Sequence, residues 1–466
     1  MVERRLPRVG FLGLMLELYD TALPKLRPTQ TKFAEELVAQ MRGYCEVVFP
    51  GICNTRGQVD GAIAEFEAMA ADLVVVVHLT YAPSLISLPG LLSTTLPVLL
   101  FNTQRLYEFS QESPQSAMTE NHGMHGVQDL ANVLVRSGRG FQLLTGHYED
   151  PRVQAELRDW IEAAYTVRKI HGARVGILGY AFEGMGDLSL DTTSLLAQVG
   201  TMVVQIPVAT VAQEAANAPS AKVKALMQED RKTFQVAKEL TAEDHERASR
   251  LEWGLRKVCE DLALDGFAMH FGAVAEDGRL ESVPFLAASK MLADGFGYGG
   301  EGDATSAVAV LMMQLLRGQA SFTEMFTMDF ANNAVVMSHM GESNWRMARK
   351  DQPIRLIRKP FPFGDCHPPA SLCFALEPGP ATLVNLVTGA EGRLKLIASE
   401  VNVLDFPAIE TFDVPHYKLT PSKGLAEFLD DYSREGGSHH LAIAFGAVAD
   451  RVEKLAWMLG LKYVLI

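Results

Sequence analysis

Two glutamates and several histidines in the second half of the chain are residue types that bind metal ions. Glu301 lies in the glycine-rich stretch "GYGGEGD", and Glu324 ends the stretch "SFTE". His339 ends an apolar run, and the pair His439 and His440 follows two glycines near the C-terminus. Two carboxylates and two imidazoles form a mixed oxygen and nitrogen ligand shell that suits Mn²⁺, Mg²⁺ or Co²⁺, and zinc is compatible with it as well.

Each of these residues, taken alone, also has a purely structural interpretation. The histidine pair opens an apolar run of strand type, and neighbouring residues of a strand point to opposite faces. Only one of His439 and His440 is therefore expected in a buried site, and the other on the opposite face. An acid at position 301 also suits the start of the helix predicted for "DATSAVAVLMMQLL", because the helix dipole favours acids there.

The glycine-rich stretch contains a formal G-x-G-x-x-G pattern at Gly297, Gly299 and Gly302. In a dinucleotide-binding loop this pattern follows a strand, whereas the preceding "PFLAASKMLADG" is predicted to be helical. Glu301 would also repel a pyrophosphate at the helix N-terminus. Dinucleotide binding is therefore not favoured, and we expect the glycines to leave room for a ligand beside Glu301.

The elements that must position these side chains change in type along the chain. Short β-branched runs alternate with helical segments in the first part, and the same rhythm restarts near residue 173. Such alternation predicts α/β domains with doubly wound parallel sheets, whose ligands lie beyond the carboxyl ends of the strands. After about residue 325, strands separated by Pro, Gly and Asp turns predict a mostly antiparallel barrel or sandwich.

Composition and charge exclude several classes of protein. The formal net charge of −14 disfavours nucleic acid and anionic membranes as partners. The apolar stretch 85–101 contains two prolines and four hydroxyl residues and is too polar to span a membrane. The basic and apolar N-terminus runs into "ELYD" without a cleavage signal and is predicted to be a buried strand, not a signal peptide. Five cysteines without a C-x-x-C motif indicate reduced thiols in the cytoplasm.

Four motifs in the same order as in a known family connect these observations. The stretches "GYGGEGD", "SFTE", "SHM" and "GGSHH" resemble those of the L-arabinose isomerase family, with comparable separations. The similarity runs over most of the chain. It implies an α/β fold class: two doubly wound parallel-sheet domains, residues 1–172 and 173–325, followed by a C-terminal β-barrel domain with a terminal helix, residues 326–466.

The resemblance also implies roles for individual residues. The implied metal ligands are Glu301, Glu324, His339 and His440, with Mn²⁺, Mg²⁺ or Co²⁺ as the cofactor. Glu301 and Glu324 are also the implied catalytic residues. The implied substrate-binding positions are His125, His122, Leu16 and Phe271.

Some positions differ from the family pattern. His122 stands where glutamine is usual, and Leu16 stands where the family has a glutamine that faces the substrate. The resemblance further implies a homo-oligomer, a tetramer or hexamer, with the active site between subunits.

The expected function is a metal-dependent aldose–ketose isomerase that works through a cis-enediol intermediate. The departure at Leu16 puts L-arabinose itself in doubt, so the substrate is a pentose, a hexose or a related sugar. Two alternatives stay open: an epimerase or other enediolate chemistry at the same metal site, and a sugar-binding protein without catalysis.

Overall fold

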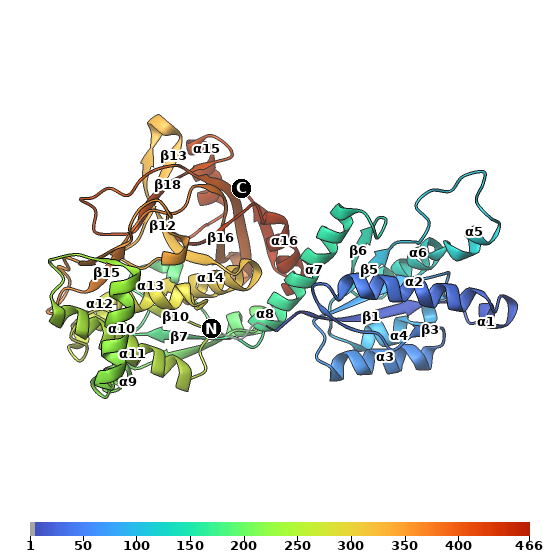
Figure 1. The fold of residues 1–466 in the computed structure, drawn as a ribbon, viewed down its shortest axis with the longest axis horizontal. Coiled ribbons are helices and arrows are strands. Elements are labelled where there is room, and N and C mark those ends of the chain that lie inside the picture. Colours follow the sequence, from blue (N-terminus) through green and yellow to red (C-terminus); the bar gives the residue numbers. More distant parts are fainter. Residues whose placement is uncertain (1–4) are drawn as a thin grey trace. The chain divides into compact units, whose positions relative to one another are not determined.

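The computed structural model describes residues 5–466, so residues 1–4 of the predicted N-terminal domain lie outside the described residues. The chain forms two compact units, which meet in sequence between Arg168 and Lys169 (Figure 1). No helix among residues 5–466 is long and apolar enough to cross a membrane.

The first unit is an α/β unit built on a six-stranded sheet. The strand order is β2-β1-β4-β5-β6, β3 also pairs with β1, and every pair is parallel. Its strands are β1 Arg8–Leu14, β2 Glu46–Val48, β3 Ile52–Cys53, β4 Leu73–His78, β5 Val98–Asn102 and β6 Gln142–Thr145. Its helices are α1 Leu18–Ala22, α2 Leu26–Met41, α3 Arg56–Ala68, α4 Leu88–Ser93, α5 Ser116–Glu120, α6 Gly123–Arg136 and α7 Pro151–Ile170.

Helices cover both faces of this sheet, which explains why its central strands are apolar throughout. Every residue of β4, "LVVVVH", is buried. Val74 and Val76 pack with α3, α4 and α6 in one apolar cluster. Figure 1 shows α2 on the opposite side of the sheet from α3. Strands of a parallel sheet that is covered on both faces have continuous hydrophobic sequences, and β4 is such a strand.

The second unit begins with a smaller parallel sheet. The strand order is β11-β10-β7-β8, with bounds β7 Arg174–Leu178, β8 Met202–Ile206, β10 Gly266–Met269 and β11 Gly297–Gly300. The helices of this part are α8 Thr192–Val199, α9 Val208–Ala216, α10 Ser220–Thr233, α11 Ala242–Asp261, α12 Phe271–Asp277, α13 Phe285–Ala293 and α14 Ala304–Arg317. Helix α14 is almost entirely buried, because it contacts β11 and β10 of this sheet and also β12, β16 and β19 of the barrel.

The rest of the second unit is a closed antiparallel barrel of six strands. The order is β16-β19-β12-β13-β18-β17, and pairing between β16 and β17 closes the ring. The bounds are β12 Ala320–Asp329, β13 Ala334–Ser338, β16 Gly379–Thr388, β17 Leu394–Val403, β18 His416–Pro421 and β19 His440–Phe445. Helices α15 Leu425–Arg434 and α16 Ala449–Leu459 follow β18 and β19, and the last strand, β20 Lys462–Leu465, pairs in parallel with β17.

Two strands predicted for the barrel lie elsewhere. β14 Arg355–Arg358 and β15 Ala370–Cys373 form a separate three-stranded sheet with β9 Gln235–Val236. The pairing of β14 with β9 joins residues far apart in the sequence, so the local pattern could not reveal it.

Two parallel α/β sheets followed by an antiparallel barrel confirm the predicted fold class. The domain boundaries proposed at 172/173 and 325/326 stay predictions.

Candidate functional site

Glu301 lies at the sharp turn between β11 and α14. Its backbone has φ +55°, a left-handed conformation that is uncommon for a residue other than glycine. Its carbonyl accepts a hydrogen bond from the Phe182 N–H at 2.9 Å. Glu301 is 9% exposed. Unusual backbone conformations of this kind cluster at functional sites, and the turn aims the carboxylate at the barrel strands instead of along the helix.

The acid that begins helix α14 is Asp303, not Glu301. Asp303 is the N-cap, and its carboxylate accepts the N–H of Ser306 at 3.0 Å and the hydroxyl of Thr305 at 2.5 Å. The helix dipole therefore has its partner in Asp303, and the dipole interpretation of Glu301 is not needed.

His440 is the first residue of β19 and is fully buried. Its Nδ1 contacts Asp303 Oδ2 at 3.1 Å, and its Nε2 lies 3.6 Å from Glu301 Oε2. That Nε2 is buried and has no hydrogen-bond partner. An unpaired buried nitrogen is costly, so its retention beside a carboxylate is a sign of a ligand.

His439 does not lie on the opposite face, as the strand alternation predicted. Its Nε2 is 3.5 Å from Glu301 Oε2, and its Nδ1 contacts Asp187 Oδ2 at 2.6 Å. The alternation rule fails here because β19 begins at His440, so His439 belongs to the preceding loop. Both rings face Glu301, with their centroids 4.1 Å apart.

His339 follows the last residue of β13 and is buried. Its Nδ1 contacts Glu342 Oε2 at 2.9 Å, and the hydroxyl of Tyr298 donates to Glu342 Oε1 at 2.5 Å. The His339 ring centroid is 5.3 Å from that of His440. Gly300 makes this approach possible, because a Cβ there would lie 2.5 Å from Cε1 of His339.

Glu324 sits on β12 between the two strands that position the histidines. It pairs with His440 of β19 on one side and with Ser338 of β13 on the other. Directly opposed residues have side chains on the same face of a sheet. The β12–β13 register shifts just after this position, between Met325 and Thr327. Such bulges re-aim side chains beside active sites.

The charges of the site act on one another. Burial alone would raise the pKa of Glu301, but the hydrogen bond to His439 and the charges of His339 and His440 outweigh it, and the pKa is lowered. The hydrogen bond to Glu301 raises the pKa of His439. Burial lowers it, the hydrogen bond to Asp187 raises it further, and the resulting pKa is about 9. The Glu301 site, defined here as Glu301, Glu324, His339, His439 and His440, therefore pairs an ionised carboxylate with a cationic ring at neutral pH.

A divalent cation fits this arrangement on the evidence of its donor atoms. One ligand atom from each of Glu301, His439 and His440 lies within 4.8 Å of the others. The unpartnered Nε2 of His440 is an atom that a metal ion would satisfy. His339 and Glu324, the other two predicted ligands, lie next to this group. The predicted ligand set itself stays a prediction, and the geometry adds His439 as a candidate.

The remaining predicted positions fall in two places. Phe271, the first residue of α12, is buried in an aromatic group with Phe182, Phe361 and Phe363. Its neighbour His270 is also buried, and its Nδ1 has no partner. Phe182 of this aromatic group donates its backbone N–H to the carbonyl of Glu301, so the group borders the Glu301 site.

Leu16, His122 and His125 lie in the first unit. The backbone N–H of Leu16, after the end of β1, donates to Thr80 Oγ1 at 3.4 Å. His122 Nε2 contacts the hydroxyl of Tyr19 at 2.9 Å, and its ring centroid is 6.0 Å from that of His125. These side chains gather beyond the carboxyl ends of β1 and β4, where parallel sheets bind ligands.

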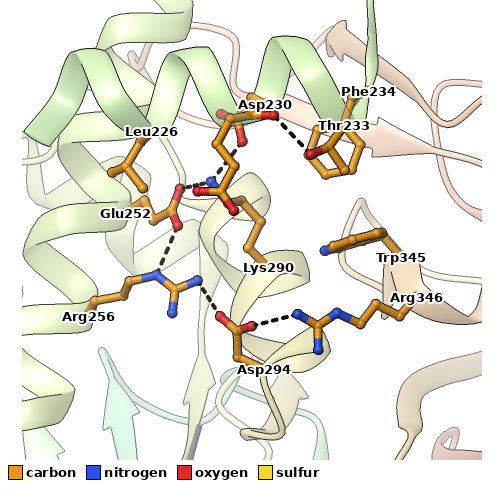
Figure 2. A pocket seen from close by; sticks show the side chains of 11 residues that line it. Leu226, Asp230, Thr233, Phe234, Glu252, Arg256, Lys290, Asp294, Trp345 and Arg346 are labelled. Atoms are coloured by element: carbon orange, nitrogen blue, oxygen red, sulfur yellow. Dashed lines mark hydrogen bonds and ion pairs between the residues drawn. The ribbon is translucent and has the colours of Figure 1, made fainter.

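Figure 2 shows a second buried charged group, built on α10, α11 and α13. Lys290 Nζ contacts Asp230 Oδ1 at 2.8 Å and Glu252 Oε2 at 2.6 Å. Arg256 joins Glu252 to Asp294 with contacts of 2.9 and 2.8 Å. His245 Nε2 contacts Asp230 Oδ2 at 2.9 Å. We call these residues the Lys290 cluster: Asp230, His245, Glu252, Arg256, Lys290 and Asp294. It borders a pocket of about 190 Å³ that Trp345 and Arg346 also line.

Known proteins match the chain over nearly its whole length. The model of the L-arabinose isomerase N-terminal domain matches residues 11–172, that of the central domain residues 178–319, and that of the C-terminal domain residues 319–462. The chain belongs to the L-arabinose isomerase family. This confirms the resemblance found in the sequence, and by family membership the protein is an L-arabinose isomerase-like aldose–ketose isomerase.

Individual relatives are distant. The L-arabinose isomerase of Nocardioides sp. is 27% identical over 401 residues, covering 83% of this chain and 78% of that protein. L-arabinose isomerase 1 of Bacillus licheniformis is 24% identical, covering 94% and 92%. The enzyme of Geobacillus thermodenitrificans is 25% identical, covering 90% and 86%.

One solved structure, an ABC transporter periplasmic solute binding protein from Actinobacillus succinogenes 130z with bound D-allose, is 11% identical and covers 67% of this chain and 92% of that chain. Its TM-score of 0.18 carries no argument.

From the sequence, one residue of the Glu301 site was misplaced and three carboxylates that contact its histidines were missed. His439 was assigned to the wrong face, and Asp187, Asp303 and Glu342 were not considered. The signal for Asp303 was present, since an acid directly before "ATSAVAV" is typical of a helix N-cap. Asp187 lies in a single 3-10 turn, Gly186–Leu188, and Glu342 in an irregular segment, so no periodic pattern reveals their partners.

Proposed function

We propose that this member of the L-arabinose isomerase family is a metal-dependent aldose–ketose isomerase that acts through a cis-enediol intermediate. The observation that carries the proposal is the buried, unpartnered Nε2 of His440, 3.6 Å from the carboxylate of Glu301. Mn²⁺ is the proposed ion, with Mg²⁺ and Co²⁺ as alternatives, because the donor set mixes carboxylate oxygen and imidazole nitrogen. The substrate is a pentose, a hexose or a related sugar.

The reaction moves one proton between C1 and C2 of the sugar and another between O1 and O2. A bound divalent cation supplies Lewis-acid stabilisation of the developing negative charge, worth several kcal/mol. Glu301, whose pKa is lowered, is ionised and able to accept the carbon-bound proton. Glu324, opposite His440 on β12, is the proposed relay for the hydroxyl proton. His439, cationic and half-buried, stabilises the ionised carboxylate of Glu301, whose Oε2 lies 3.5 Å from its Nε2.

The first unit supports a choice of sugar other than L-arabinose. Leu16 is half-buried and its side chain has no hydrogen-bonding group, whereas the family position it occupies is predicted to carry a glutamine facing the substrate. A site that lacks one polar contact discriminates differently among sugar hydroxyls. The same departure keeps an epimerase on the same metal site as a second candidate.

The experiment is a panel of aldoses and ketoses with added Mn²⁺, in D₂O, followed by deuterium uptake at C2 and by product analysis. An isomerase gives the aldose–ketose pair, and an epimerase gives the C2 epimer. Release of bound sugar unchanged and undeuterated across the panel would contradict both.

Glu301→Gln tests the assignment of the base. The change removes the proton acceptor, so kcat falls by about 10²–10⁴-fold while the fold is kept. Glu65→Gln, an exposed glutamate of α3, is the matched control and keeps full activity. Substantial isomerase activity in Glu301→Gln would show that another group is the base.

The homo-oligomer, a tetramer or hexamer with its active site between subunits, stays a prediction from the family resemblance. If His122 and His125 serve a neighbouring subunit, specific activity falls on dilution to nanomolar concentration as the oligomer dissociates. A fully active monomer would contradict this part of the proposal.

A further inference from the structure

All three histidines of the Glu301 site share one arrangement. In each of them Nδ1 contacts a carboxylate outside the predicted ligand set. The contacts are His339 with Glu342 at 2.9 Å, His440 with Asp303 at 3.1 Å, and His439 with Asp187 at 2.6 Å. For His439 and His440, the other ring nitrogen, Nε2, is the one that faces Glu301.

The carboxylate that contacts each imidazole ring determines which ring nitrogen carries the hydrogen. An ionised carboxylate only accepts hydrogen bonds, so the Nδ1 that contacts it carries the hydrogen. In a neutral imidazole the Nε2 then holds the lone pair that binds a metal ion. We propose that Glu342 and Asp303 are positioning residues, which fix the rings of His339 and His440 with Nε2 directed inward, an inference that rests on the proposed metal-dependent function.

Both carboxylates are themselves held in place. Glu342 is 2% exposed and accepts the hydroxyl of Tyr298, which is fully buried. Asp303 is 1% exposed and accepts the hydroxyls of Thr305 and Ser306, each at 2.5 Å. A carboxylate with fixed partners offers one orientation to the imidazole, so the ring has no second rotamer of equal energy.

Glu342 offers the cleaner test, because Asp303 also begins helix α14. Glu342→Gln keeps the size of the side chain and removes the charge that holds the Nδ1–H of His339. Partners of this kind contribute about 10–100-fold to metal affinity. We expect the dissociation constant for Mn²⁺ to rise by that factor when the ion is titrated calorimetrically into full-length, chelator-stripped protein.

The matched control comes from the Lys290 cluster. Asp230 is a buried carboxylate bonded to a buried histidine, His245, at the same 2.9 Å distance, and neither residue belongs to the Glu301 site. Asp230→Asn is expected to lower the melting temperature of the metal-free protein and to leave the Mn²⁺ dissociation constant within twofold of the parent's.

Tyr298→Phe is the second variant, in case Glu342→Gln does not fold. It removes one hydroxyl and weakens Mn²⁺ binding severalfold by loosening Glu342. A Mn²⁺ dissociation constant of Glu342→Gln within twofold of the parent's overturns the inference. If only Tyr298→Phe folds, the same result in that variant overturns it. An equal loss of Mn²⁺ affinity in Asp230→Asn also overturns it.

A parent protein that binds no Mn²⁺ overturns the metal site together with the inference. A parent that binds Mn²⁺, with Glu342→Gln weakened but no sugar turned over, overturns the proposed function and supports the positioning role.

Discussion

The Glu301 site and the Lys290 cluster contain similar buried side chains and differ in how their charged and polar groups are paired. Both combine buried carboxylates with histidine in the second unit, and the Lys290 cluster adds Lys290 and Arg256. In the Lys290 cluster every carboxylate faces a cation, and burial, which would lower the pKa of Lys290, is outweighed by Glu252 and Asp230. In the Glu301 site the Nε2 of His440 has no partner.

We expect that difference to distinguish a group that holds the fold from a group that binds a ligand. Buried charges are tolerated when they are paired, and in the Lys290 cluster each buried carboxylate has a cation beside it. A site that is to bind a cation must keep an acceptor unsatisfied, at a cost in stability. The four experiments that follow probe this distinction, starting with the largest expected effect.

His440→Gln should abolish most metal affinity, because it removes the nitrogen that has no other partner. We expect the Mn²⁺ dissociation constant to rise by about 10³-fold, roughly 4 kcal/mol. His439→Gln should raise the dissociation constant less than tenfold if that ring pairs with Glu301 and does not bind the ion. Calorimetric titration of both variants decides between the two histidines, and a larger loss in His439→Gln would exchange their roles.

Lys290→Met should act on stability and not on binding. It leaves Asp230 and Glu252 as buried carboxylates without their shared cation, which costs about 3 kcal/mol of unfolding free energy. Denaturant unfolding measures the loss, and calorimetry on the folded protein should give the Mn²⁺ affinity of the parent. Loss of metal affinity with unchanged stability would show that the two groups are not independent.

His78 extends the comparison to a histidine with no carboxylate contact. It is 2% exposed, both ring nitrogens lack partners, and burial, only partly offset by Asp129, lowers its pKa to about 4. The unfolded chain takes up a proton near pH 6.5 and the folded chain does not. The stability that neutral His78 contributes is therefore present above pH 6.5 and is lost as the pH falls toward 4.

Between pH 7 and pH 5 this loss amounts to about 2 kcal/mol. His78→Leu should flatten that part of the pH profile of unfolding free energy. Equal slopes in the parent and in His78→Leu would contradict the assignment.

Arg346→Ala should have the smallest effect. Its guanidinium is partly exposed and lies 3.3 Å from Asp294, at the rim of the Lys290 cluster (Figure 2). Exposed ion pairs contribute less than about 1 kcal/mol. Unfolding at low and high salt should differ little between the variant and the parent, and a loss above 2 kcal/mol would place Arg346 inside the cluster.

Much of the fold could be predicted from the sequence. Parallel strands buried on both faces are continuous apolar runs, as in "LVVVVH" of β4, and such runs are visible in the sequence. The closing of the barrel and the partners of β14 depend on contacts between distant segments, and no local pattern encodes them. The three-stranded sheet with β9 is the clearest example.

For the site, residue types proved more informative than periodicity. Glu301, Glu324, His339 and His440 were named from their chemistry and from collinear motifs. The face of His439 was predicted wrongly because the rule of alternation was applied one residue before the strand begins. Glu342 was missed because it approaches His339 through an irregular loop, where spacing has no fixed geometric meaning.

The position of β19 inside the barrel has a consequence for shortened chains. β19 lies between β12 and β16 and pairs with both. A chain that ends before residue 440 therefore loses more than His440, since β12 and β16 are each left with an unpaired edge. Exposed strand edges pair with other chains. Premature termination in this region yields an aggregating product, and not a folded protein that merely lacks one histidine.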